Sequence, residues 1–215
     1  MAINDLIAAA QVYFPKLQIK YKDQDPFMKF LGKLMFFNPA FMTSFVTTLG
    51  DTVYLPSQAY MQQSPQGFMD VFIHECTHMH DEAKHGILYK LGYALPQLLA
   101  PLMLLLLFVL SWKIVIPLAL LMFAPLPAPF RAYFEKRAYF VQMFVGYKLW
   151  GVDPVQSGPH YAKFFRDSSY YFMWPFEQDQ SFIDEGNNIK AGHPACAAEP
   201  DLLQMVNDLM AAAKK

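Results

Sequence analysis

The sequence predicts an α+β fold made mainly of α-helices, and three observations support this class. Residues 64–86 and 131–151 space their apolar side chains as amphipathic helices do, and both segments carry end signals. Residues 44–57 hold two runs of β-branched and aromatic residues, which is typical of a β-hairpin. Residues 91–130 contain 30 apolar residues in 40 positions, which indicates a hydrophobic helical hairpin between the two long helices.

The N-terminal part of the chain carries the weaker signals. Residues 1–40 are predicted as short helices that break near three prolines, at positions 15, 26 and 39. The β-hairpin that follows is expected to turn at Gly50-Asp51, and Pro56 ends its second run. We therefore expect little sheet and many helices.

The helix predicted over residues 64–86 has the best-defined ends in the chain. Ser64 can act as its N-cap, and Pro65 fits the first helical position, where a missing N–H costs nothing. Gly86 fits the left-handed conformation that often ends a helix, and Gly151 does the same for the second long helix.

Composition excludes several classes of protein. The chain has 215 residues, of which 54% are hydrophobic and 16% are charged, so it is not a disordered protein. Its net charge is −1 and it has no basic run, so nucleic acid is not an expected partner. The length suits one domain. We predict that residues 1–90 and 131–215 form its two halves and that residues 91–130 are an insert.

The predicted helix over residues 64–86 contains a metal-binding pattern, His74-Glu75-Cys76-Thr77-His78. Two histidines four positions apart project from one helical face, so both imidazoles can bind one Zn²⁺ ion. Glu75 is rotated by about 100° from His74, beside the metal. There it can accept a proton from water whose pKa the metal lowers. The pattern therefore predicts a catalytic zinc site with Glu75 as the general base.

The third metal ligand follows by elimination. Catalytic zinc sites often add a carboxylate to two histidines. No acidic residue occurs between Glu82 and Glu135, so Glu135, on the second long helix, is the first distal carboxylate available. The alternative for Glu135 is an ion pair with Arg131, one turn earlier. Asp81 follows His78 by three positions and is better placed to orient a ligand than to bind the metal.

The motif and its distal glutamate resemble the gluzincin metallopeptidases. The sequence is most similar to the membrane-bound CAAX-prenyl-protease type and to its soluble minigluzincin relatives, which carry H-E-x-x-H on one helix and E-x-x-A-D on another. Here Glu135 and Ala138 match the second motif. The resemblance implies a zincin-like domain, a peptide or protein substrate, and an edge strand in the hairpin that holds this substrate extended.

The sequence departs from the family at one position, because Tyr139 replaces the aspartate of the second motif. That aspartate orients a zinc-bound histidine in the family, so the resemblance assigns the role to Tyr139 or to Asp81. The donor that stabilises the transition state stays open. His160 and Tyr161 are candidates, and Tyr139, Tyr170 and Tyr171 are chemically able as well.

The apolar insert is long enough to predict a membrane location. Leu91–Trp112 would measure about 33 Å as a helix and Ile114–Phe130 about 25 Å, with Lys113 between them at a polar tip. More basic residues flank the open end than the tip, which would put the zinc site on the cytoplasmic side. The alternative is a hairpin buried against protein, either in the fold or in a homo-oligomer.

These patterns together predict a zinc metalloendopeptidase that acts at or near a membrane. One alternative is a metal-stabilised component of a larger assembly, such as a phage virion, with the insert at residues 91–130 as its contact. Another is a membrane-inserting module without hydrolysis.

Overall fold

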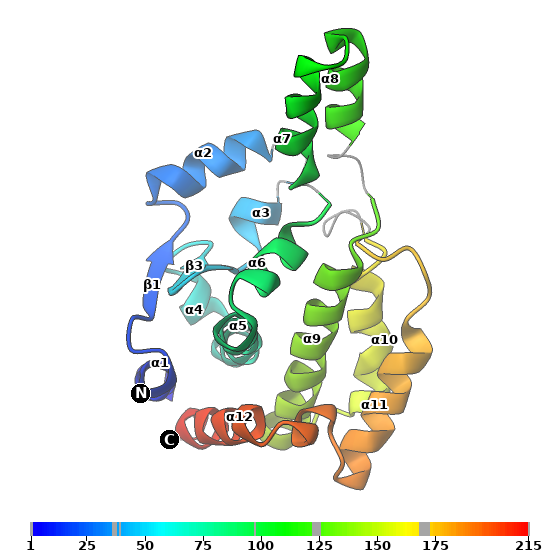
Figure 1. Cartoon of the computed structure of the whole chain (residues 1–215). Helices are drawn as coiled ribbons and strands as arrows, with labels where there is room; N and C mark the ends of the chain where they lie inside the picture. The colour runs from blue at the N-terminus through cyan, green and yellow to red at the C-terminus, as the bar shows by residue number, and fades with distance from the viewer. Residues whose placement is uncertain are drawn as a thin grey trace.

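Helices make up most of the protein and a three-stranded sheet completes it, so the predicted α+β, mainly α class is confirmed (Figure 1). The computed structural model describes residues 2–35, 38, 40–96, 98–121, 126–167 and 173–214. Its elements in chain order are α1 (Ala2–Tyr13), β1 (Gln18–Tyr21), α2 (Pro26–Leu34), α3 (Ala40–Thr43), β2 (Thr47–Leu49), β3 (Thr52–Leu55), α4 (Tyr60–Gln63), α5 (Pro65–His85), α6 (Ile87–Ala94), α7 (Leu99–Leu104), η1 (Leu105–Phe108), α8 (Trp112–Leu121), α9 (Pro129–Trp150), α10 (Pro154–Phe164), α11 (Asp179–Ala191), η3 (Ala195–Ala198) and α12 (Pro200–Ala213).

The sheet has the strand order β1-β3-β2. β2 and β3 pair antiparallel across a turn at Gly50, whose φ of 56° is left-handed and favours glycine. β1 pairs parallel with β3, so it corrects the expectation of helices alone before residue 40. β2 therefore lies at an edge of the sheet, while the central strand β3 buries Val53 and Leu55.

α5 begins and ends where its local signals predict, and α9 ends as Gly151 predicts but begins two residues before the predicted position 131. The Ser64 hydroxyl accepts a hydrogen bond from the Gly67 backbone N–H at 3.3 Å and caps α5, and Gly86, with a φ of 56°, follows its last residue. α9 begins at Pro129 and ends before Gly151, which is in the left-handed region. Both helices are thus set by residues at their own ends.

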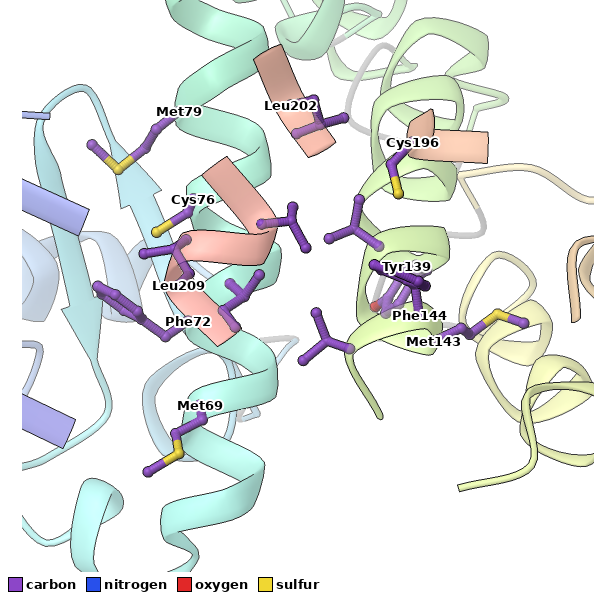
Figure 2. Close-up of a cluster of buried hydrophobic side chains, with 14 of the residues drawn as sticks. Met69, Phe72, Cys76, Met79, Tyr139, Met143, Phe144, Cys196, Leu202 and Leu209 are labelled. Atoms are coloured by element: carbon purple, nitrogen blue, oxygen red, sulfur yellow. The ribbon is translucent and has the colours of Figure 1, made fainter. Parts of the chain in front are cut away.

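The core lies where α5, α9 and α12 meet. Figure 2 shows Phe72 and Cys76 of α5, Phe144 of α9 and Leu202 and Leu209 of α12 gathered in this region. Burying an aromatic or branched aliphatic side chain contributes about 1.5–3 kcal/mol. α5 lies between the sheet and α9, and α10 and α11 lie beyond α9 (Figure 1). This core holds α5 beside α9, which positions the site described below.

The predicted transmembrane hairpin is wrong. Among the described residues, no helix combines the length and the apolar character that crossing a membrane requires. The described residues 98–121 instead form α7, η1 and α8, of which α8 is the longest with 10 residues, about 15 Å. A span needs about 20 residues. The predicted membrane location, with the site on the cytoplasmic side, is overturned by the same finding.

The error has a physical reason. Summed hydropathy over residues 91–112 and 114–130 does not show where a helix ends. Here α6 ends before Leu95, and the 3-10 helix that begins after Leu104 ends before Val109. Pro117 lies inside α8, where its ring removes a backbone hydrogen bond. Residues 122–125, in the second predicted span, lie outside the described residues.

α7 and α8 nevertheless pack side by side and project beyond the rest of the molecule (Figure 1). Most of their large apolar side chains are exposed, and the Phe108 side chain is 91% exposed. We call this part, residues 98–121, the apolar hairpin. Its exposed residues include Leu102, Leu104, Leu105, Leu107, Val109, Leu110, Trp112, Ile114, Ile116, Leu120 and Leu121.

Candidate metal centre

Two histidines of α5 form one side of the candidate metal centre. His74 and His78 lie one helical turn apart and both are buried. Their Nε2 atoms are 3.2 Å apart, and their rings meet edge to face with centroids 4.9 Å apart. The two nitrogens that can bind a metal therefore face the same point.

Glu135 of α9 completes the group. Its Oε2 atom lies 3.5 Å from His74 Nε2, and its Oε1 atom lies 3.6 Å from His78 Nε2. Glu135 is buried, and the candidate ligand atoms of the three residues all lie within 4.8 Å of one another. The structure thus brings together the three residues that the sequence predicts as metal ligands, from two helices of the core.

The spacing of these atoms suits a metal ion. Ligand atoms at ~2.0–2.1 Å from one zinc ion, in tetrahedral directions, lie about 3.3 Å from each other. The two Nε2 atoms are 3.2 Å apart, and each lies 3.5 or 3.6 Å from one of the two Glu135 oxygens, which is close to that value. Glu135 Oε2 is buried and has no hydrogen-bond partner among the described residues. A buried carboxylate oxygen without a partner is costly, and a cation at this point would satisfy it.

The charges of the group are strongly coupled. Burial alone would lower the pKa of His78, but the nearby carboxylates, above all that of Glu135, outweigh burial and raise it above its ordinary value. Burial alone would raise the pKa of Glu135, whereas His78 and His74 hold it well below its usual range. Glu135 is therefore a carboxylate at neutral pH, which is the form that binds a metal.

Glu75 lies in the same cavity but outside the group of three. Its Oε2 atom accepts a hydrogen bond from the Thr48 hydroxyl at 2.6 Å, so a residue of β2 fixes the orientation of this carboxylate. Glu75 is buried among its neighbours yet lines the cavity. The predicted general base thus stands beside the three candidate ligands, as its place in the motif indicates.

Tyr93 of α6 is a residue of the site that the sequence did not predict. Its hydroxyl donates a hydrogen bond to Glu135 Oε1, and its ring meets the His78 ring edge to face, with centroids 5.8 Å apart. The Arg131 Nε atom donates to the Tyr93 backbone carbonyl at 3.1 Å and ties α6 to α9. Burial, with Glu135 next, raises the pKa of Tyr93 well above its ordinary value, so the hydroxyl keeps its proton.

Asp81 and Tyr139, the two residues predicted to orient a metal-bound histidine, make different contacts. Asp81 is fully buried and accepts two hydrogen bonds from Arg137, at 2.8 Å and 3.2 Å, so it clamps α5 to α9. Tyr139 packs its ring on the His74 ring, with centroids 4.6 Å apart. No described side chain accepts a hydrogen bond from the buried Nδ1 atoms of His74 and His78.

The predicted transition-state donors His160 and Tyr161 lie outside the lining of the cavity, with Tyr161 next to Tyr139. Both belong to α10, and the Tyr161 ring stands 5.3 Å from the Tyr139 ring. His160 packs on Phe164 at 5.1 Å. Neither residue is among those that line the cavity at the candidate centre. Tyr170 and Tyr171 lie outside the described residues.

A cavity of about 540 Å³ opens next to the candidate metal centre. Such a volume is within the range of ligand-binding pockets. Segments from four parts of the chain line it, namely the end of α2, the stretch from α3 through β2, the middle of α5, and α6 with the start of α9. Its lining residues are Met35, Asn38, Phe41, Phe45, Val46, Thr47, Thr48, Leu49, Gly50, His74, Glu75, His78, Glu82, Tyr89, Lys90, Tyr93, Ala94, Arg131 and Glu135.

We compared the chain with models of protein families, with curated proteins and with solved structures, and none of the three comparisons found a match. The resemblance to the gluzincins therefore stays a prediction from the motif residues. What the structure adds is a buried His74, His78 and Glu135 cluster that could hold a metal ion.

Proposed function

We propose that the protein is a zinc-dependent metallopeptidase with a zincin-like domain. The observation that carries this proposal is the position of Glu75, whose carboxylate lies in the same cavity as the converging His74, His78 and Glu135 side chains. A metal site that serves only as a structural clip needs neither a cavity nor a separate carboxylate held beside the ligands.

Nitrogen and carboxylate donors in this number favour zinc. His74, His78 and Glu135 would hold the ion through Nε2, Nε2 and a carboxylate oxygen, a set that leaves one position for a water or substrate. When bound, the ion would supply Lewis acidity that polarises a carbonyl and lowers the pKa of water. Tyr93 keeps Glu135 in its ligating orientation through the hydrogen bond to Oε1.

The chain's own groups then account for the proton transfers of amide hydrolysis. Glu75 accepts a proton from the attacking water as the oxygen of that water adds to the carbonyl carbon. The resulting carboxylic acid donates that proton to the amide nitrogen as the C–N bond breaks, which restores the Glu75 carboxylate. Thr48 holds the acceptor in place from β2.

β2 is suited to hold the substrate. It is an edge strand, so the backbone groups on its outer side are available to an extended peptide. Thr47, Thr48 and Leu49 all line the cavity, and Thr48 touches Glu75 directly. A peptide bound along β2 would thus pass the general base.

Glu75→Gln tests the proposal. We expect the variant to bind zinc as the wild type does and to lose about 10²- to 10⁴-fold in peptide hydrolysis, because glutamine cannot accept the proton. Zinc content by mass spectrometry and cleavage of a peptide mixture measure the two effects. Glu82→Gln, a change in a second glutamate of the same cavity, is the matched control and should leave both unchanged. Full hydrolysis by Glu75→Gln would contradict the mechanism.

A second candidate is a metal-stabilised component of a larger assembly, such as a phage virion. The exposed side chains of the apolar hairpin favour it, because patches of this kind often mark protein contacts. Sedimentation velocity of the zinc-loaded protein tests this role. A defined oligomer that dissociates when Phe108 and Trp112 are replaced by serine, in a protein that hydrolyses no peptide, would favour it over the peptidase.

A further inference from the structure

Lys22 connects the two outer strands of the sheet. It directly follows β1 and is fully buried. Its backbone N–H donates to the Leu55 carbonyl at 2.8 Å, so the end of β1 is fixed to the end of β3. Its side chain reaches the start of β2, the strand on the other side of β3. A residue far from the candidate metal centre in the sequence is thus tied to the strand that borders the cavity.

The ammonium group of Lys22 fixes the chain that leads into β2. Its Nζ atom donates to the Phe41 carbonyl at 2.7 Å, to the Phe45 carbonyl at 2.8 Å and to the Thr47 hydroxyl at 2.7 Å. All three ammonium N–H groups therefore have acceptors, and the centre of the Phe41 ring lies 4.0 Å from Nζ. Burial lowers the pKa of Lys22 to about 8, so the group is still a cation at pH 7. An apolar side chain of the same length would leave all three acceptors without this donor.

The next residue along β2, Thr48, holds the general base. Its hydroxyl donates to Glu75 Oε2 at 2.6 Å, while the Thr47 hydroxyl accepts from Lys22. Side chains alternate along a strand, so these two contacts lie on opposite faces of β2, and the position of one strand sets both. The Glu75 carboxylate also raises the pKa of Lys22 against the effect of burial. The two charges therefore lie near enough to attract each other.

We propose that Lys22 is a positioning residue for the general base, because its ammonium group holds β2 where Thr48 keeps the Glu75 carboxylate beside the candidate metal ligands. This inference rests on the proposed peptidase function and adds a residue on which the activity depends. The residues that line the cavity do not include Lys22. Its loss should therefore change the orientation of Glu75 and leave metal binding as it is. A displacement of about 1 Å at a reacting group can cost about 10²-fold in rate.

The NMR signal of the Glu75 carboxylate tests this positioning without any need for hydrolysis. Carbon-13 labelling at glutamate Cδ reports on the side-chain carboxylates of the zinc-loaded protein, and Glu75→Gln identifies one signal by removing it. We expect Lys22→Met to move this signal in the same direction as Thr48→Val, because both release Glu75 from β2. Lys20→Met is the matched control, since Lys20 is an exposed lysine of β1, and it should leave the signal in place. An unchanged signal in Lys22→Met would overturn the proposal.

Thr47→Val is a milder variant that serves if Lys22→Met does not fold. It removes one of the three acceptors and keeps the lysine, so we expect the Glu75 signal to move by a smaller amount in the same direction. A signal that Thr48→Val moves and Thr47→Val leaves in place would also overturn the proposal.

A double-mutant cycle tests whether Lys22 acts through Thr48. At pH 7 and a saturating concentration of a peptide mixture, Lys22→Met should lower the rate of hydrolysis by about tenfold or more. In the Thr48→Val protein, the same change should cost less than about twofold, because the contact through which Lys22 acts is already absent. Zinc affinity should equal that of the wild type in each variant. Rate losses that multiply in the double variant, or a loss of zinc affinity in Lys22→Met, would overturn the proposal.

The two proposals fail separately. If Lys22→Met moves the Glu75 signal but the wild type cleaves no peptide, Lys22 positions Glu75 and the peptidase function falls. If the wild type cleaves peptides and Lys22→Met changes neither the signal nor the rate, the peptidase stands and the positioning role falls.

Discussion

The candidate metal centre and the apolar hairpin both depart from the usual distribution of side chains, but in opposite ways. Around the candidate metal centre, residues that normally seek water are buried beside a charged partner, as with Glu135 beside the two histidines and Asp81 beside Arg137. In the apolar hairpin, residues that normally avoid water are exposed. The buried charges have partners within the chain, while an exposed apolar surface of this kind often marks a contact with another molecule.

The comparison also shows what each region contributes to stability. Two buried charged groups hold separate segments together in and beside the first region. Asp81 of α5 accepts two hydrogen bonds from Arg137 of α9. Lys22 donates three hydrogen bonds, to the Phe41 and Phe45 carbonyls and to the Thr47 hydroxyl. Within residues 98–121, the apolar hairpin, Lys113 is the one charged residue, and its side chain is exposed, so it joins no buried ion pair there. We therefore expect the fold to depend on the first region far more than on the second.

Replacing one phenylalanine in the core next to the candidate metal centre and one in the apolar hairpin gives the largest expected contrast in stability. Phe72→Ala removes a side chain that is 1% exposed and should lower the free energy of unfolding by about 3–5 kcal/mol. Phe108→Ala, at a residue that is 91% exposed, should change it by less than about 0.5 kcal/mol. Urea denaturation measures both. Comparable losses in the two variants would mean that the apolar hairpin is buried in solution.

A smaller effect is expected from Asp70, which joins α5 and α9, the two helices of the candidate metal centre. Its Oδ1 atom accepts a hydrogen bond from the Trp150 indole at 2.7 Å, and burial raises the pKa of Asp70 to about 6. The folded protein therefore holds a proton between about pH 4 and pH 6 that the unfolded chain has released. The contribution of Asp70 to stability falls as the pH rises through that window.

Asp70→Asn should flatten this part of the pH dependence. Asparagine keeps an acceptor for Trp150 without the buried charge, so we expect the variant to be about 1 kcal/mol more stable than the wild type at pH 7 and equal to it below pH 4. Thermal unfolding from pH 4 to pH 8 measures the difference. Asp23→Asn, at an exposed aspartate, is the control. A variant less stable than the wild type at pH 7 would show that Asp70 stabilises the fold as a carboxylate.

Sequence reasoning succeeded where the signal is local or chemical. Ser64, Pro65 and Gly86 mark the ends of α5 because caps act within one turn of the helix. The two histidines follow from helical spacing alone. Glu135 is the first carboxylate after Glu82, so elimination identifies it as a candidate ligand without knowledge of how the helices pack.

It failed where the outcome depends on contacts between distant segments. The four residues of β1 carry no periodic signal strong enough to show their parallel pairing with β3. Tyr93 belongs to the apolar stretch of residues 91–130, so composition does not mark its hydroxyl as a partner for Glu135. The same summed hydropathy predicted membrane spans where the backbone forms short helices.

The most direct test of the account is the zinc affinity of Glu135→Ala against that of Glu82→Ala. Both glutamates line the cavity, and only Glu135 lies with His74 and His78. Removing a partner that merely orients a ligand costs about 10- to 100-fold in metal affinity, so loss of a ligand should cost about 100-fold or more. We predict that loss for Glu135→Ala, by competition with a chelating dye, and wild-type affinity for Glu82→Ala. Wild-type affinity in Glu135→Ala would contradict the proposed metal centre.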